Sequence, residues 1–531
     1  MYKYKNYIIN LLLPAFVLGS VTGIITALVV SVYKLCAKLV ISMSEKGYHY
    51  LGERLYLIPV LLVALFVIAL FFSFIYKKIP NLKGGGIPTS IGILRGIITF
   101  KWLRNLIGIF IMSLMTFMMG VPLGNEGPSV QIGTAVGRGC VYTFAKDHKA
   151  WDRYSMTGGA CSGFSVATGA PISGILFAIE EAHQRISPMI IIVSSVSVMF
   201  ANITAEIISP LLGVSVTLFP ELSLVKLTLS NIWIPLIVGI TVGLFAVAFL
   251  YYYKLINAFF NKKIKKLHHA YKISMVLFAT LLLGLISHDF ISTGHELILE
   301  LLEGKTAIYM LFLILAVRAT LTLSANTNKI TGGLFIPLLT LGAVLSSFIG
   351  EVIEYIFGLE HQYYMIILIL GIVACISSMM KMPLTAIIFA VEALGCYENI
   401  LYVVVVSAVS FVITEIFGAK SINDTVLENR VEEFNEGKTP MVYDTFVTVK
   451  KDAFAVGKQV RDIFWPANLF VLSVKHDESR KAEVDEHGGK AIREGDILHV
   501  RYSTVNEEET KEELISIVGI QDYKENKAVE I

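Results

Sequence analysis

The stretch GNEGPSVQIG, residues 124–133, holds a carboxylate, Glu126, between small residues and a proline, with long apolar runs on both sides. A charge at the centre of a lipid-exposed helix costs about 2.5–3.5 kcal/mol on insertion scales. A side chain kept at that cost marks, by default, a path for ions or protons. Glu126 is therefore the first candidate for a functional residue.

The composition predicts that this stretch lies in a membrane. Of the 531 residues, 55% are hydrophobic and only 16% are charged, and the mean hydropathy is +0.68, whereas soluble domains have about 25% charged residues. A spanning helix needs about 20 apolar residues. We expect an all-α polytopic protein of the cell membrane. The apolar runs cover residues 7–34, 54–76, 104–123, 188–212, 232–257, 272–288 and 307–323, with more between 330 and 418.

Basic residues suggest how the chain is oriented. They are concentrated at Lys3 and Lys5, in YKKIPNLK (76–83) and in NKKIKKLHH (261–269). Loops rich in lysine and arginine face the cytoplasm. We therefore predict that these three regions and both termini are cytoplasmic.

Two sequence motifs recur in the same order. PISGILFAIE (171–180) and PLTAIIFAVE (383–392) share the spacing of Pro, Ile, Phe, Ala and Glu, and PSVQIG (128–133) corresponds to PLLTLG (337–342) at a nearly equal offset. Repeated halves with Gly- and Pro-interrupted apolar segments are typical of transporters, whose site lies at the interface of inverted repeats. We predict two homologous halves, about residues 1–215 and 225–420, within a transport domain of residues 1–420.

Three interrupted segments share one chemistry. KGGGIP (83–88), GNEGP (124–128) and GGLFIP (332–337) each place glycines just before a proline, and proline favours the first helical turn. The free N–H groups of a helix start attract anions, and glycine allows a ligand to approach the backbone closely. One such motif alone could mark only a loop or tight helix packing, but three together favour an anion site.

At these motifs the sequence resembles the CLC family of chloride channels and proton-coupled anion exchangers. The three segments stand where the family has GSGIP, GREGP and GxFxP, and the resemblance covers roughly residues 10–430. It implies a lipid-embedded homodimer with one anion pathway in each subunit and with Glu126 as the external gating and proton glutamate. The anion-binding positions that it implies are Gly85, Gly86, Ile87, Asn125, Glu126, Gly127, Leu334, Phe335 and Asn423.

A second carboxylate distinguishes an exchanger from a channel. In AIEEAHQR (178–185), Glu181 aligns with the internal proton glutamate of the family's exchangers. Its neighbour Glu180 corresponds to Glu392 in the other repeat, and we expect a structural role for it. The alternative for Glu181 is a solvated helix end at the cytoplasmic face. The resemblance favours an H+/Cl− exchanger that takes chloride or a similar small anion together with protons.

Three departures from the family's motifs keep other functions open. Gly85 stands where the chloride-type motif has serine, and Asn423 stands where the family usually has the tyrosine of the inner gate. Asn125 replaces the arginine of GREGP, as in the family's fluoride exporters, although those typically have methionine at the Gly85 position. A passive voltage- or pH-gated chloride channel and a fluoride/proton antiporter therefore remain alternatives.

The chain becomes charged after residue 419. We expect a linker over residues 421–440 and a small α+β cytoplasmic domain over residues 441–531, with strands in DTFVTVK (444–450) and DILHVRYS (496–503). AIREGDILHVRY (491–502) resembles the TrkA-C (RCK C-terminal) domain, which implies a small regulatory ligand, or dimerisation. The alternative is a passive oligomerisation module.

Other classes of function are disfavoured by the sequence. A TrkA-C-regulated cation transporter would need a carbonyl-rich filter such as TVGYG, and the sequence contains none. GHELILE (294–300) lacks the second histidine of a zinc site, and the five cysteines lack metal-ligand spacing. We therefore expect neither an enzyme nor a metal or cofactor site. No basic tract with interleaved aromatic residues predicts nucleic-acid binding.

Overall fold

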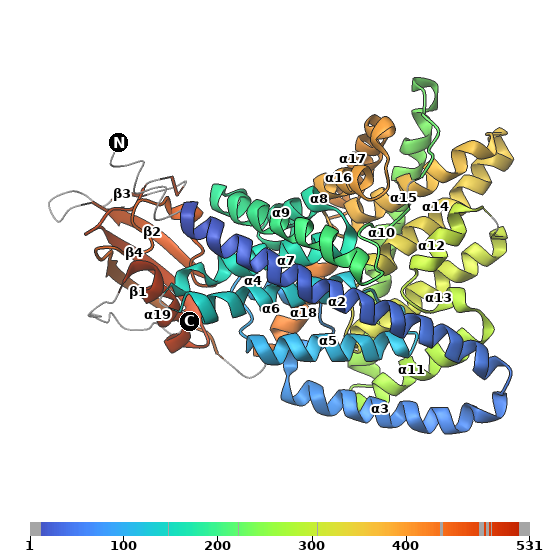
Figure 1. The fold of residues 1–531 in the computed structure, drawn as a ribbon, viewed down its shortest axis with the longest axis horizontal. Coiled ribbons are helices and arrows are strands. Elements are labelled where there is room, and N and C mark those ends of the chain that lie inside the picture. The colour runs from blue at the N-terminus through green and yellow to red at the C-terminus, as the bar shows by residue number, and fades with distance from the viewer. Residues whose placement is uncertain are drawn as a thin grey trace.

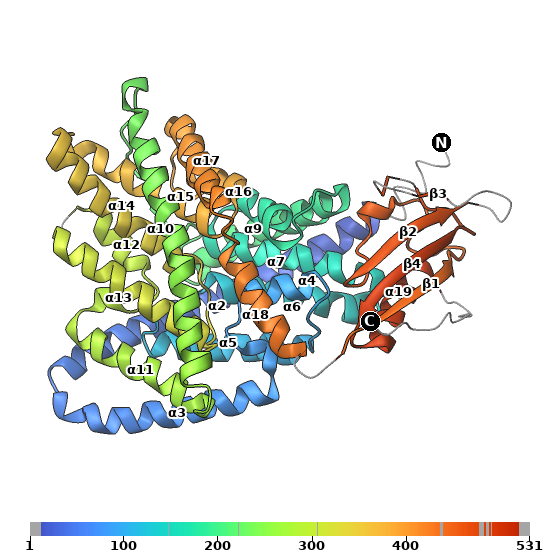
Figure 2. The same ribbon diagram turned by 180° about the vertical axis from the view of Figure 1, so that it is seen from behind.

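The computed structural model describes residues 12–146, 148–220, 222–304, 306–435, 439–476, 483–484, 488–489 and 491–519. Lys3 and Lys5 lie outside the described residues. Within the described residues, helices predominate as far as residue 435, and an antiparallel sheet packed with an α-helix follows. Figure 1 and Figure 2 both place this sheet at one end of the molecule, beside the N-terminal part of the first long helix.

The helices of the first half are α2 (Leu13–Gly52), α3 (Ile58–Lys78), α4 (Ile87–Leu94), α5 (Trp102–Met118), α6 (Glu126–Phe144), α7 (Asp152–Thr168), α8 (Pro171–Phe177) and α9 (Pro188–Leu211). Those of the second half are α10 (Trp233–Ala258), α11 (His269–Ile286), α12 (His295–Leu302), α13 (Ile308–Thr327), α14 (Phe335–Phe357), α15 (Tyr364–Met379), α16 (Pro383–Glu392) and α17 (Ile400–Ile416), and α18 (Ile422–Asn435) follows them. Within the described residues, nine helical segments are long and apolar enough to cross a bilayer. The prediction of an all-α polytopic membrane protein is confirmed.

A glycine pair lets two neighbouring helices pack closely in each half, and the helices concerned are equivalent: α6 and α7 in the first half, α14 and α15 in the second. A Cβ atom on Gly133 of α6 would lie 2.0 Å from the carbonyl oxygen of Gly159 on α7. In the second half, a Cβ atom on Gly342 of α14 would lie 2.8 Å from the carbonyl oxygen of Gly371 on α15. Small residues at such crossings let helix backbones approach within a membrane. The halves therefore repeat a packing as well as a sequence motif.

The two halves are joined by reciprocal caps at α8 and α16. The Glu180 carboxylate, just after α8, accepts hydrogen bonds from the backbone N–H groups of Leu384 and Thr385 at 2.9 and 2.7 Å. The Glu392 carboxylate, at the end of α16, accepts from the N–H groups of Ile172 and Ser173 at 2.7 and 2.9 Å. Each glutamate thus satisfies orphan donors at a helix start of the other half. Such reciprocity is what a twofold axis between the repeats produces.

The segment expected to be a linker contains a helix. α18 occupies residues 422–435 and packs along α4. Its Arg430 is only 6% exposed and donates hydrogen bonds to the carbonyl oxygen of Gly84 and to Oγ1 of Thr89. These buried bonds attach α18 to the helical part of the protein, so the polar composition of 421–440 does not mean an extended connector.

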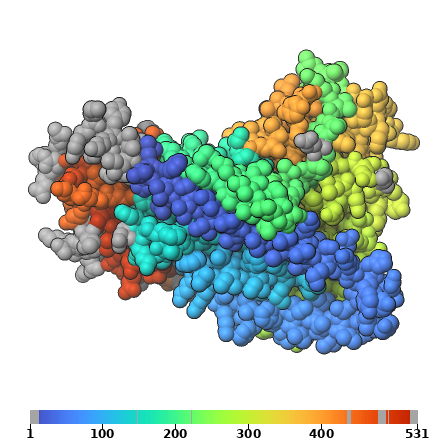
Figure 3. Space-filling view, viewed as in Figure 1, coloured from blue at the N-terminus to red at the C-terminus, as the bar shows by residue number. Residues whose placement is uncertain are grey.

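The C-terminal unit is a four-stranded antiparallel sheet in the order β1-β4-β2-β3. Strands predicted in DTFVTVK and DILHVRYS fall in β1 and β4, which pair with each other. The unit has its own apolar core, which includes Val447, Leu498, Val500 and Leu514. In the space-filling view it sits directly against the helical part (Figure 3). Its elements are β1 (Met441–Thr448), β2 (Leu469–Lys475), β3 (Glu483–Val484), β4 (Ile497–Thr504) and α19 (Glu507–Val518).

Candidate functional site

Three helix starts meet deep inside the helical part. Gly124 and Gly333 form an antiparallel bridge, and both of its N–H to carbonyl-oxygen distances are 2.8 Å. A Cβ atom on Gly127 would lie 2.6 Å from the Cα atom of Gly333, and one on Gly86 would lie 3.1 Å from the Cα atom of Gly127. Because no side chain fits between these backbones, glycine allows the starts of α4, α6 and α14 to converge.

Backbone N–H groups that have no backbone acceptor line two of these starts. They belong to residues 125–127, which open α6, and to Leu334 and Phe335, which open α14. Among the described residues, none of these amides donates a hydrogen bond to another backbone carbonyl. Orphan donors at the positive end of a helix dipole form an anion-binding surface. These are the amides that the sequence analysis named, and they remain the candidate anion-binding groups.

The carboxylate of Glu126 lies at this surface. The side chain is fully buried, and neither oxygen forms a regular hydrogen bond. The backbone N–H groups of Glu126 itself and of Ile336 face it. A Cβ atom on Gly124 would lie 2.5 Å from Oε2, so the carboxylate occupies the space that a side chain there would take. The carboxylate thus lies at the candidate anion-binding surface, between the starts of α6 and α14.

Glu181 lies in a second buried cluster, on the π-helical turn η5 (Ala178–Ala182) that follows α8. Its side chain is 2% exposed, so the interpretation as a solvated helix end is wrong. Oε1 accepts hydrogen bonds from Nδ2 of Asn423 at 3.0 Å and from Oγ of Ser421 at 3.4 Å. Asn423, expected at the inner gate, is therefore bonded to Glu181. Its Oδ1 is buried with no partner, which leaves an acceptor free beside the carboxylate.

An arginine holds the main chain around Glu181. Arg95, at the end of α4, donates from Nη2 to the carbonyl oxygen of Glu181 at 2.8 Å and from Nε to that of Ala182 at 2.9 Å. Its Nη1 forms an ion pair with Asp424 of α18 at 2.9 Å. The turn that carries Glu181 is thus tied to the same helix, α4, whose start faces the anion surface.

Comparison with known proteins identifies the family. The family model for the voltage gated chloride channel matches residues 64–415, more than half of the chain. This chain is a member of the CLC family.

Individual CLC relatives agree with the family match. The H+/Cl− exchange transporter ClcA of Salmonella arizonae is 26% identical over 432 residues, which cover 78% of this chain and 88% of ClcA. A slow cyanobacterial Cl−/H+ antiporter has a TM-score of 0.71 at 23% identity and covers 79% of this chain and 99% of its own. A CLC-type fluoride/proton antiporter has a TM-score of 0.64 at 18% identity, with 76% and 96% covered. The solved structures, at these identities, show the shared CLC fold.

At the start of α4, in the GGGIP motif, a backbone N–H group is hydrogen-bonded by a side chain that the sequence analysis did not single out. Gln131 of α6 accepts a hydrogen bond from the backbone N–H of Gly86 at 2.5 Å and donates from Nε2 to Oδ1 of Asn105 at 3.0 Å. The Gly86 amide, one of the predicted anion donors, is therefore occupied in this structure. Ile87 is the first residue of α4 and is buried. No local pattern distinguishes Gln131 from other polar residues in small-residue helices.

We expect Gly85→Ser to sharpen discrimination for chloride over nitrate, once room is made for it. A Cβ atom at Gly85 would lie 2.5 Å from Cδ1 of Ile109 and 2.9 Å from Oε1 of Gln131. Ile109→Val removes the first of these contacts. In that background a serine hydroxyl adds a donor in a water-poor site, where an unmatched polar group costs about 1–3 kcal/mol. Anion competition in liposomes measures the ratio.

Gly85→Ala in the same Ile109→Val background is the control, since it adds the Cβ atom without the hydroxyl. Equal chloride-to-nitrate ratios in the serine and alanine variants would mean that Gly85 does not face the transported anion.

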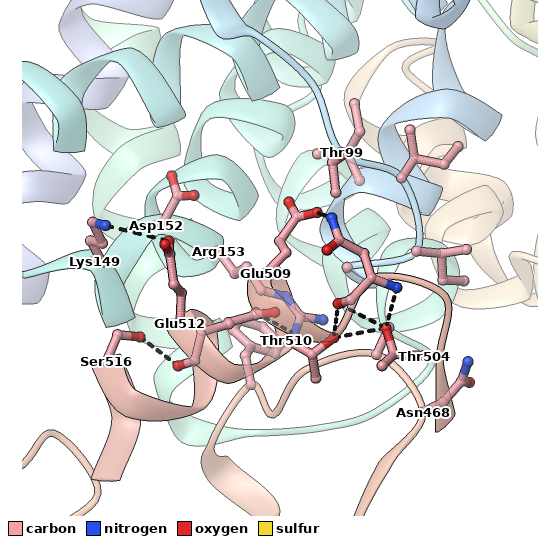
Figure 4. A pocket seen from close by; sticks show the side chains of 18 of the residues that line it. Thr99, Lys149, Asp152, Arg153, Asn468, Thr504, Glu509, Thr510, Glu512 and Ser516 are labelled. Atoms are coloured by element: carbon pink, nitrogen blue, oxygen red, sulfur yellow. Dashed lines mark hydrogen bonds and ion pairs between the residues drawn. The ribbon is translucent and has the colours of Figure 1, made fainter. Parts of the chain in front are cut away.

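A cavity of about 390 Å³ lies between the CLC helices and the C-terminal unit. Figure 4 shows Lys149 and Arg153 on the side of α7, opposite Glu509 and Glu512 of α19. Arg153 pairs with Glu513 at 3.4 Å and Lys149 with Glu512 at 3.9 Å. The cavity therefore has both signs of charge, and ion pairs connect its two walls.

Proposed function

We propose that this protein exchanges chloride for protons across the membrane. The observation that carries the proposal is the fully buried Glu126 carboxylate among helix-start amides that have no other backbone acceptor. A helix start contributes about 0.3–2 kcal/mol to binding a negative charge, so converging starts are needed to offset the desolvation of one ion. A chloride ion and the Glu126 carboxylate compete for the same donors.

Protonation of Glu126 links anion and proton movement. When ionised, Glu126 occupies the anion surface and excludes chloride from it. When protonated, it no longer competes as an anion, so it leaves the surface and chloride enters. Glu181, buried beside Ser421 and Asn423, delivers protons from the cytoplasmic side. The free Oδ1 of Asn423 can accept a hydrogen bond from water or from a protonated Glu181, which suits a proton route.

The arrangement of lysines supports the proposed orientation, with the Glu181 side facing the cytoplasm. Lys83 and Lys265, from two loops predicted to be cytoplasmic, line one cavity of about 290 Å³. Lys83 also pairs with Glu433 on α18 at 2.9 Å, and Asn423 near the other end of α18 bonds to Glu181. The homodimer, the cytoplasmic termini and the TrkA-C-like role of the tail remain predictions. A small regulatory ligand would fit in the cavity of about 390 Å³ between the helices and the C-terminal unit.

The alternatives differ from exchange in what they require. A passive chloride channel needs no buried internal glutamate, whereas Glu181 is 2% exposed and hydrogen-bonded. A fluoride/proton antiporter shares the exchange mechanism and differs in the anion. This alternative stays open because Asn125 replaces the arginine of GREGP, as in the family's fluoride exporters. A cation transporter needs oxygen ligands at its site, whereas the converging helix starts present N–H groups.

Purified protein in liposomes tests the proposal directly. With an imposed chloride gradient, an exchanger drives protons uphill, and its reversal potential lies between those of chloride and protons. A channel moves no protons and reverses at the chloride potential. Fluoride in place of chloride, at the same gradient, decides between the two antiporters. The absence of proton movement with both anions would contradict exchange.

A further inference from the structure

We propose that Phe464, in the C-terminal unit, is a positioning residue for Glu181. It holds the turn of residues 183–187, which begins two residues after Glu181, so that proton delivery depends on the docked unit. The inference rests on the proposed function, because it gives Glu181 its proton role. It assigns the C-terminal unit a part in coupling.

The Phe464 ring packs against α7 and against the turn of residues 183–187. Its side chain is 4% exposed. Its ring centroid lies 4.3 Å from that of Tyr154 on α7 and 4.4 Å from that of His183. The guanidinium groups of Arg153 and Arg185 lie 5.1 and 4.6 Å from the ring centroid. Aromatic and cationic contacts of this kind hold a ring in a defined orientation.

Hydrogen bonds from the same short segment reach the same turn. Oγ of Ser187 donates to Oδ1 of Asp462 at 3.1 Å, and Arg185 donates to the carbonyl oxygen of Ile463 at 3.4 Å. Tyr154 donates to the carbonyl oxygen of Asp462 at 2.7 Å. Residues 462–464 therefore contact the turn at three of its five residues.

The turn needs such support because its own backbone is irregular. Gln184 has a φ of 51°, a left-handed backbone conformation that residues other than glycine rarely adopt. The preceding turn, which carries Glu181, is π-helical, a form that is rare and occurs frequently at functional sites. Strained conformations persist only where the surroundings hold them. Arg95 holds the Glu181 side of the turn, and residues 462–464 hold the other side.

Phe464→Ala in the full-length protein tests the inference. We expect the ratio of protons to anions moved to fall by about 2- to 30-fold, the range expected for a coupling residue, while anion flux persists. Phe470→Ala is the matched control, because Phe470 lies in the same unit but is 65% exposed, and it should keep the parental ratio. Phe464→Leu keeps apolar volume but loses the ring contacts, so a smaller fall is expected and the test survives if alanine prevents folding.

The proton-to-anion ratio distinguishes positioning from simple anchoring. If Phe464 only anchors the unit, its loss reduces the number of active molecules and lowers both fluxes together. An unchanged ratio in both Phe464 variants would overturn the inference while leaving the exchanger intact.

Hydrogen exchange supplies a measurement that does not depend on transport. Amides of residues 183–187 should exchange faster in Phe464→Ala than in Phe470→Ala. Equal exchange in the two variants would overturn the positioning role. If the parental protein moves no protons, the proposed function fails, and with it the part of the inference that concerns coupling. The amide hydrogen-exchange measurement still decides whether Phe464 holds the turn.

Discussion

Anion flux through the Glu126→Gln variant should persist, but it should lose its dependence on external pH and its coupling to protons. Glutamine has nearly the shape of a protonated glutamate and cannot ionise, so it removes both the competing negative charge and the titration. The starts of α6 and α14 are then always available to chloride. We expect the reversal potential to move to that of chloride.

Flux and reversal potential in liposomes, recorded over a range of external pH, provide the measurement. Glu398→Gln is a suitable control, because it neutralises an exposed carboxylate outside both clusters and should behave like the parent. A Glu126→Gln variant that still moves protons uphill would exclude Glu126 as the gating glutamate.

The second large effect is expected from Glu181→Gln, which should abolish proton movement and leave anion flux sensitive to external pH. Glu126 keeps its titration in this variant, so the outer gate still responds to protons from outside. The amide of glutamine can retain a hydrogen bond to Asn423 or Ser421, which keeps the turn in place, but it cannot carry a proton. The loss is therefore specific to delivery from the cytoplasm.

Proton uptake and anion flux have to be measured on the same vesicles for this variant. Asn423→Ala is an informative companion, because it removes the hydrogen-bond partner of Glu181 but leaves the carboxylate. It should reduce proton transfer less than Glu181→Gln. Proton pumping by Glu181→Gln at the parental rate would mean that protons enter elsewhere.

The sequence predicted the convergence of helix starts because the chemistry is local. Glycines before a proline mark a helix start wherever they occur, and three such motifs in two repeated halves leave few arrangements. A close backbone contact between two of these motifs, such as the bridge between Gly124 and Gly333, could therefore be expected. The role of Gln131 could not, since its partner Gly86 lies just before another helix, α4, and local sequence does not encode that contact.

Asn423 and α18 are further cases in which the sequence did not predict a contact between distant segments. The inner-gate position of Asn423 stays a prediction from the motif, whereas the bond from its Nδ2 to Glu181 depends on how α18 packs and could not be read from the sequence. α18 itself was expected as a linker because its sequence is polar. A polar sequence usually indicates a solvent-exposed segment, whereas here Arg430 is buried against the carbonyl oxygen of Gly84, just before α4, and the hydroxyl of Thr89 on α4. Tertiary contacts set both the bond between Asn423 and Glu181 and the packing of α18.

The exchange of glutamate caps between α8 and α16 has a consequence for how the protein is made. During synthesis, the start of α8 is made more than 200 residues before Glu392. Its N–H groups at Ile172 and Ser173 therefore have no partner from this pair until the second half inserts, and an unpaired backbone group in hydrocarbon costs several kcal/mol. Each half is thus an incomplete folding unit, and the nascent first half has to wait, shielded by water, lipid headgroups or the insertion machinery, for its counterpart.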